Sequence, residues 1–371
     1  MKVKKSLKVR WIITAVALVL LAAAGIAAKL SVGFANWYGD VIYPFLVGIF
    51  ARISGIFPFS LAEIVVTLAV LTCLFAIIYF IVQLVRKKGQ RLRFLLSSVS
   101  TAAMVLSLVG AGFMYSCGIN YYRTPFSAYS GIDIRTYTTD EVRETLEYII
   151  ENTNRLIDEV ELDENGQCVL PDNLRSVTAS AMYALAEQYP ALSSYYPQAK
   201  PVLASPLMCY TKIVGIFTPY TMEANYNTCD MPEDIGHTIC HELSHLTGFM
   251  REDEANFISY LACRGSGDKY LEYSGFYSTL GHMLNAYYKA VSYEEYVRIV
   301  GTIDARVYRQ ICLESEFWSQ FDTPVAEVSN AVNDTYLKIN DQSDGTKSYG
   351  RMADLVIGEY LKNISKKIPR S

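Results

Sequence analysis

The chain has 371 residues, of which 51% are hydrophobic and 19% are charged. Soluble domains are roughly one quarter charged, so this composition excludes both a disordered chain and a purely soluble globular protein. Residues 1–117 carry 12 Lys and Arg against 2 Asp and Glu, whereas residues 118–371 carry 21 against 35. The acidic carboxyl-terminal part argues against nucleic acid as a partner.

Three apolar stretches, at about 11–28, 61–85 and 94–116, are each long enough to cross a lipid bilayer as a helix. A cleaved signal peptide is the alternative for the first stretch, because residues 22–28 are mostly small. Basic clusters lie before the first stretch and between the second and third, at residues 86–93. Because positive charge stays in the cytoplasm, we expect a multi-pass protein with a cytoplasmic N-terminus and an extracytoplasmic C-terminal domain.

Residues 31–60 are crowded with aromatic side chains, which favour the headgroup layer of a bilayer. This pattern predicts an interfacial helix around Val41–Ile56, or alternatively a short hairpin packed on the spans. With the three spans, this segment completes a membrane domain at residues 1–117.

Residues 118–137 are rich in Tyr, Gly, Pro and Ser and are interpreted as a linker. Residues 138–371 predict a mainly helical domain: Thr138 and Glu141 form a capping box, and Asn173–Tyr189 has a helical pattern. Residues 212–218 are β-branched and aromatic, which predicts a strand or hairpin. The expected fold class is therefore mostly α, with a small sheet. Eight irregularly spaced cysteines without a CxxC pair predict no disulfide framework.

The pattern with chemical meaning is His-Glu-Leu-Ser-His at residues 241–245. His241 and His245 are four residues apart, so a helix brings both imidazoles to one face, where they can reach one Zn²⁺ ion. Glu242 lies about 100° further round the helix, too far to be a third ligand. Its carboxylate is placed to take a proton from a water molecule at the metal, as a general base does.

A third ligand has few sources. Cys240 does not share the histidine face, and three histidines in a row with His237 would spread over about 12 Å. His237 is therefore interpreted as a packing residue or a partner of a ligand. Gly248 suits a sharp turn after the helix, and residues 252–254 are three consecutive acids that open the next helical pattern. An ordinary acidic helix N-terminus is the alternative interpretation of these acids.

Residues 241–245 followed by Glu-Asp-Glu-Ala-Asn at 252–256 resemble the gluzincin metallopeptidases, and are similar to the ImmA/IrrE-type and HtpX-type peptidases. The resemblance implies a zincin-like domain with His241, His245 and Glu252 as zinc ligands and Glu242 as the catalytic base. The chain also looks like a family of uncharacterised bacterial membrane proteins, through its spans and through residues 58–60, 215–225 and 348–351. Glu252 is preferred over Glu254 because its helix face is small or polar and carries Asn256, a partner for a ligand histidine.

The resemblance further implies that the strand before the zinc helix, at residues 222–227, is an edge strand that pairs with an extended peptide through Ala224 and Asn225. A simple connecting strand is the alternative. The transition state also needs a donor for its oxyanion, and the polar candidates are His282, Tyr349 and Arg351. The family resemblance favours Tyr349 and Arg351 as catalytic residues.

Two functions from different classes fit these features. The first is a zinc metallopeptidase anchored in the lipid bilayer of the bacterial cytoplasmic membrane, which hydrolyses a peptide or protein substrate on the outer side. The second is a non-catalytic, zinc-stabilised module that acts as an envelope sensor or scaffold. Glu242 favours the first, because a structural zinc site has no use for a general base.

Overall fold

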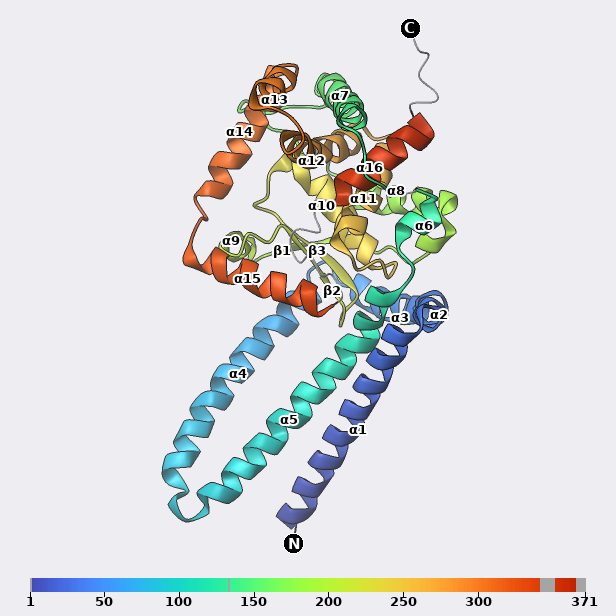
Figure 1. Cartoon of the computed structure of the whole chain (residues 1–371). Coiled ribbons are helices and arrows are strands. Elements are labelled where there is room, and N and C mark those ends of the chain that lie inside the picture. The colour runs from blue at the N-terminus through green and yellow to red at the C-terminus, as the bar shows by residue number, and fades with distance from the viewer. Residues whose placement is uncertain (1, 133, 341–350, 365–371) are drawn as a thin grey trace.

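Three long helices extend together from one side of the remaining chain (Figure 1): α1 (Lys2–Leu30), α4 (Leu61–Arg86) and α5 (Arg91–Ser116). The structure is a computed structural model that describes residues 2–132, 134–340 and 351–364. Within these residues, three helical stretches are long and apolar enough to cross a membrane, at Ser6–Leu30, Leu61–Arg86 and Lys88–Ser116. They coincide with the three predicted spans and indicate a membrane protein.

The three long helices are not equally packed. α1 lies along α5, where Arg10 of α1 donates hydrogen bonds to Ser97 and Thr101 of α5. In α4 only Ala62, near the start of the helix, is buried within the described residues. Figure 1 shows α5 between α4 and α1, with the short connection from α4 to α5 at the end far from the helical domain. α4 therefore depends on contacts at its N-terminus for its position.

The segment between the first two long helices is helical throughout, as α2 (Val32–Trp37), η1 (Tyr38–Ile42) and α3 (Tyr43–Gly55). The predicted helix around 41–56 is confirmed, and the alternative hairpin is wrong. One side of α3, with Tyr43, Val47 and Ala51, is buried because these residues recur every four positions. The buried side packs on the helical domain, and the exposed side is also apolar, with Phe45, Ile49 and Ile53.

The rest of the chain forms the helical domain. The short helix η2 (Lys88–Gln90) lies in the connection between α4 and α5. The helices of the helical domain are η3 (Gly118–Tyr122), α6 (Phe126–Ser130), α7 (Thr139–Leu156), α8 (Leu174–Gln188), η4 (Pro190–Leu192), α9 (Ser205–Cys209), α10 (Pro232–His245), α11 (Glu252–Arg264), α12 (Lys269–Tyr288), α13 (Tyr293–Val300), α14 (Ala305–Ser319), α15 (Pro324–Ile339), α16 (Arg351–Glu359) and η6 (Tyr360–Ile364). The predicted capping box of Thr138 and Glu141 is confirmed at the start of α7. The expected linker contributes to the core, since Ile119, Tyr121 and Phe126 are buried.

A three-stranded sheet lies beside α10, with β1 (Lys200–Val202), β2 (Gly215–Thr218) and β3 (Glu223–Asn227) in the order β1-β3-β2. β1 pairs with β3 in parallel and β2 pairs with β3 antiparallel, so β3 is the central strand. The expectation that residues 222–227 form an edge is therefore wrong. Asn225 pairs with Lys200 of β1 on one side and with Ile216 of β2 on the other, while Ala224 pairs with Phe217 of β2. Among the described residues, β2 has a paired strand on one side only, and its other edge borders the site.

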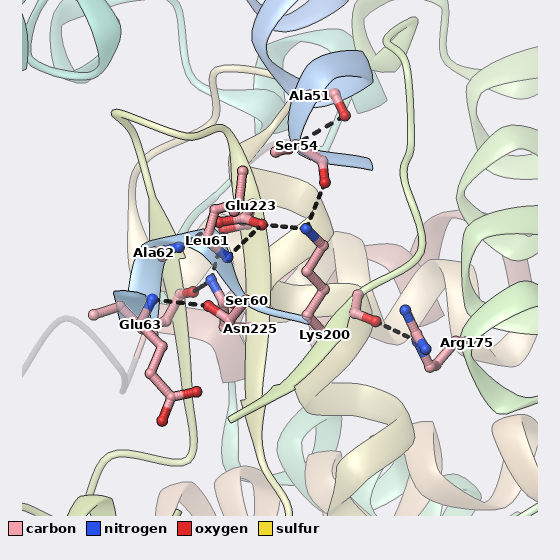
Figure 2. Close-up of polar contacts among 12 residues, drawn as sticks. Ala51, Ser54, Ser60, Leu61, Ala62, Glu63, Arg175, Lys200, Glu223 and Asn225 are labelled. Atoms are coloured by element: carbon pink, nitrogen blue, oxygen red, sulfur yellow. Dashed lines mark hydrogen bonds and ion pairs between the residues drawn. The ribbon is translucent and has the colours of Figure 1, made fainter. Parts of the chain in front are cut away.

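A buried ion pair joins the sheet to the second long helix (Figure 2). Lys200 of β1 pairs with Glu223 of β3, and both side chains are at most 2% exposed. The Glu223 carboxylate also accepts the backbone N–H groups of Leu61, at 3.2 Å, and Ala62, at 2.7 Å, in the first turn of α4. A carboxylate is stabilised there because a helix N-terminus carries partial positive charge. Glu223 thus ties the central strand directly to a candidate membrane span.

A second carboxylate makes the reciprocal contact. Glu63, in the first turn of α4, accepts the backbone N–H groups of Leu203 at 3.0 Å and Ala204 at 2.7 Å. Lys200 also donates to the carbonyl oxygen of Ser54 at the end of α3, at 2.7 Å. These contacts connect α3, α4 and β1 at one point, which we call the sheet–helix joint.

We expect Glu223→Ala to destabilise the full chain by about 3–5 kcal/mol, because it leaves the Lys200 ammonium buried without a counter-charge. The unfolding midpoint of the purified protein in mild detergent measures the effect. Asp322→Ala is the control, since it removes the partner of Lys212 in an ion pair whose carboxylate is 69% exposed, and should cost under about 1 kcal/mol. Equal, small losses in both variants would contradict the role assigned to the joint.

Candidate metal centre

The two motif histidines lie in the last turns of α10. Pro232 begins this helix and Glu233 and Asp234 occupy its first turn, all favoured at a helix N-terminus. His241 and His245 share one face, and their ring centroids are 4.9 Å apart. The sequence spacing therefore brings both imidazoles to the same place.

A tight turn after α10 returns the chain to these histidines. Gly248 has φ +86°, a conformation that favours glycine, and Arg123 donates to the carbonyl oxygen of Thr247 at 2.8 Å. Tyr43 of α3 donates to the carbonyl oxygen of His245 at 3.1 Å, which caps the end of α10. Because α11 begins at Glu252, only six residues separate it from α10, and its first side chain faces the histidines.

His241, His245 and Glu252 form a compact cluster. The Nε2 atom of His241 lies 3.1 Å from Oε2 of Glu252, and Nε2 of His245 lies 3.9 Å from Oε1. One ligand atom from each residue lies within 4.8 Å of the others. Tetrahedral zinc with bonds of about 2.0–2.2 Å separates its ligand atoms by roughly 3.3–3.6 Å. The residues present therefore fit a zinc ion, with two nitrogen donors and one carboxylate.

Hydrogen bonds orient both imidazoles. His241 donates from Nδ1 to Oδ1 of Asn256 at 2.8 Å, and His245 donates from Nδ1 to the carbonyl oxygen of Phe249 at 2.9 Å. Each Nε2 atom is thereby left facing Glu252, as in metal sites whose ligand histidines are held by a second partner. His237 donates from Nε2 to the carbonyl oxygen of Asn256 at 3.3 Å. Both residues expected to support the ligands, Asn256 and His237, are therefore beside them.

Charge reinforces this geometry. Burial disfavours a charged imidazole, but the hydrogen bond and charge of Glu252 raise the pKa of His241 to about 9. His245 is farther from the carboxylate, and burial lowers its pKa to about 4. Burial opposes ionisation of Glu252 as well, yet its hydrogen bond with His241 lowers the pKa of this carboxyl. The cluster therefore concentrates one carboxylate charge between two imidazoles.

Glu242 packs against the free edge of β2. Its side chain is close enough to Gly215 that a Cβ atom on this glycine would lie 2.5 Å from Oε1 of Glu242. The backbone N–H of Phe217 also binds the carboxylate, while burial raises the pKa of Glu242 to about 8. Glycine at 215 thus makes room for Glu242 between α10 and the sheet.

These groups border a cavity of about 850 Å³ between β2, α10, α12, α14 and α15. His241, Glu242, His245 and Glu252 all line it, as does His282 of α12. The sequence interpretation missed β2 as the strand that borders the site. Its signal was available in the β-branched and aromatic residues 212–218.

A tyrosine pair that the sequence did not single out also lines this cavity. The hydroxyl groups of Tyr121 in η3 and Tyr336 in α15 lie 2.9 Å apart. Burial first, and the negative charge of Glu252 among further causes, raise the pKa of both hydroxyls. Both therefore stay protonated beside the cluster. With 28 tyrosines in the chain, no local pattern distinguishes these two.

Other sequence candidates lie elsewhere. Arg351 begins α16 and pairs with Asp253, with 3.3 Å between Nε and Oδ2, and it is not among the residues that line the cavity. Tyr349 lies outside the described residues. Glu254 accepts the backbone N–H of Phe126 at 2.8 Å and is not part of the cluster.

The chain belongs to the family described as a protein of unknown function, DUF3810, which matches residues 38–357. The expected membership of an uncharacterised family is thereby confirmed. No curated protein and no solved structure matches the chain. The family has no assigned function, so any activity must be argued from the site itself.

We expect Glu252→Ala to abolish stoichiometric zinc binding, because it removes one of three donors. Glu254→Gln is the matched control: it removes a neighbouring buried carboxylate but keeps an acceptor for Phe126, and should leave the metal in place. Metal analysis of the zinc-loaded, desalted full-length variants measures both. Full zinc occupancy in Glu252→Ala, with loss of zinc in Glu254→Gln, would show that Glu254 is the ligand and that the assignment of Glu252 is wrong.

Proposed function

We propose that this protein is a membrane-anchored zinc metallopeptidase that hydrolyses peptide bonds. The observation that carries the proposal is the position of Glu242, whose buried carboxylate lies against the edge of β2 in the same cavity as His241, His245 and Glu252. This combination supplies a metal site, a base and a surface for a peptide in one place. It also agrees with the gluzincin resemblance of the two motifs.

The donor set favours zinc with an open position. Two imidazoles and one carboxylate are typical catalytic zinc ligands, and the fourth position is then free for water or substrate. A structural site would be closed by a fourth protein ligand. Among the described residues, the His241, His245 and Glu252 group contains no fourth donor, and it faces the cavity. These features favour a peptidase over a zinc-stabilised sensor or scaffold.

A bound zinc ion would supply Lewis acidity that polarises a carbonyl group and acidifies water. In its ionised form, which a bound cation would favour, the Glu242 carboxylate accepts the proton of the attacking water and passes it to the leaving amine. Burial of Glu242 keeps this carboxylate away from bulk water and next to the metal ligands. Asn256 and Phe249 hold the histidines in the orientation that the ligands need.

The free edge of β2 is suited to bind the substrate backbone. The N–H of Asn227 donates to the carbonyl oxygen of Val214, and hydrogen-bonded pairs alternate along two antiparallel strands. The backbone N–H and C=O groups of Ile216 therefore point toward β3, and those of Gly215 and Phe217 point outward. An extended peptide can pair with the outward backbone groups of Gly215 and with the carbonyl oxygen of Phe217, whose N–H binds Glu242. The hydroxyls of Tyr121 and Tyr336 are the neutral donors we assign to the developing oxyanion, in place of Arg351.

Glu242→Gln tests the proposal. This variant removes a base and not a ligand, so we expect zinc content and unfolding midpoint to be unchanged while the rate of peptide hydrolysis falls by about 10²–10⁴-fold. The assay uses the full-length, zinc-loaded protein in detergent with a mixed peptide library, read by mass spectrometry. Loss of zinc in Glu242→Gln, or cleavage at the wild-type rate, would overturn the assigned role.

We also propose that the N-terminus is cytoplasmic and the helical domain extracytoplasmic. The basic residues Lys8 and Arg10 of α1 and residues 86–93 between α4 and α5 belong to the end that lies away from the helical domain (Figure 1). Clusters of Lys and Arg stay on the cytoplasmic side.

A reporter enzyme that is active only outside the cytoplasm, fused after Ser371, should therefore be active. The same reporter fused between α4 and α5, after Gly89, should be silent and is the control. Activity of the fusion after Gly89, with no activity of the fusion after Ser371, would show that the topology is the inverse of the one proposed.

A further inference from the structure

A second set of acidic side chains lines the same cavity at a distance from the metal cluster. Asp230 precedes α10, Asp234 lies in its first turn, and Glu314 belongs to α14, so three separate positions in the chain contribute. We call these residues the acidic subsite. Neither the zinc ligands nor Glu242 depend on it, and the proposed hydrolysis does not use it.

The acidic subsite has fewer partners than its burial calls for. Asp230 is only 5% exposed, and although its Oδ1 accepts the N–H of Met231, its Oδ2 has no hydrogen-bond partner among the described residues. Asp234 accepts the hydroxyl of Ser278, and Glu314 accepts the hydroxyl of Tyr277. No Lys, Arg or His side chain in the described part of the chain forms an ion pair with any of the three carboxylates.

This arrangement costs stability without an evident structural gain. Burial, and then mutual repulsion between the carboxylates, raise the pKa of Asp234 and raise that of Asp230 to about 7. Burial also raises the pKa of Glu314. The partial positive charge at the N-terminus of α10 can stabilise the carboxylate of Asp234. It cannot stabilise that of Glu314, which lies in the middle of α14. A ligand with positive charge and several hydrogen-bond donors would satisfy all three.

A metal ion is a poorer fit than an organic cation. Among the described residues, only His241, His245 and Glu252 bring donor atoms as close together as a metal requires. A guanidinium or ammonium group, in contrast, donates hydrogen bonds to carboxylates that are spread around it. The acidic subsite therefore suits the side chain of arginine or lysine.

Its distance from the metal cluster fits a peptide. Asp234 precedes His241 by seven residues on α10, which corresponds to about 10 Å along the helix. An extended peptide advances roughly 3.3 Å per residue, so about three residues span this distance.

The position of β2 indicates in which direction a bound peptide would run. Asn227 donates to the carbonyl oxygen of Ile213 and accepts the N–H of Asp230, which brings the start of β2 to the acidic subsite. Phe217, near the other end, binds Glu242. A peptide that runs antiparallel to β2 therefore directs its carboxyl-terminal part toward the acidic subsite.

We propose that Asp230, Asp234 and Glu314 bind an arginine or lysine side chain of the substrate, two or three residues after the peptide bond that is cleaved. This inference rests on the proposed peptidase function and adds a substrate class to it. It predicts a peptidase that selects basic residues on the carboxyl-terminal side of its cleavage site.

The test compares decapeptides that carry arginine or citrulline, its neutral isostere, at successive positions after the cleaved bond. For the full-length, zinc-loaded protein we expect kcat/KM to be about 10–100-fold higher with arginine at the second or third position, as for a charge-assisted hydrogen bond. The double variant Asp234→Asn with Glu314→Gln should lower this ratio to near one and leave the citrulline peptides unaffected. Glu316→Gln, on the exposed side of α14, is the charge-matched control and should keep the preference.

The two proposals can fail separately. No arginine preference, or a preference that the double variant retains, overturns the acidic subsite while the peptidase function stands. If the wild type cleaves no peptide, the peptidase proposal fails. The acidic subsite is then tested by equilibrium binding of fluorescently labelled arginine and citrulline decapeptides to zinc-loaded Glu242→Gln. Tighter binding of arginine that is lost in the double variant would support it, and equal dissociation constants would overturn it.

Discussion

Two hydrogen bonds determine what this cavity can do. Asn256 and the carbonyl oxygen of Phe249 each hold the Nδ1 of one motif histidine, and this leaves both Nε2 atoms facing Glu252. Both acceptors come from the turn and helix after α10, so the tight connection at residues 246–251 assembles the ligand set as well as its support. A candidate metal site built this way has its side chains already oriented without an ion.

The sheet–helix joint gives this site a fixed relation to the candidate membrane helices. Glu223 of the central strand binds the first turn of α4, and Tyr43 of α3 binds the end of α10, so both walls of the site contact the membrane domain. The strand that borders the cavity, β2, is paired with β3 and is therefore positioned by the same joint. The membrane domain is thus part of the support of the site and not only an anchor.

Local patterns predicted the spans, the capping box at Thr138 and the face shared by His241 and His245, because each depends on residues within one helix. The comparison of helix faces also selected Glu252 over Glu254, since the spacing from Glu252 to Asn256 is one helical turn. The prediction of residues 222–227 as an edge strand was wrong because β1 has only three residues and becomes a strand through its pairing with β3. The acidic subsite and the tyrosine pair bring together residues 84 and 215 positions apart, which no local pattern encodes.

We propose that two histidines and one carboxylate hold zinc and leave a position for water. X-ray absorption at the zinc edge, on the purified full-length protein loaded with one equivalent of zinc, tests it most directly. We expect a first shell of about four nitrogen and oxygen atoms at roughly 2.0–2.1 Å, with the outer-shell signal of two imidazoles. A sulfur shell near 2.3 Å, the signal of a third imidazole, or no stoichiometric zinc would contradict it.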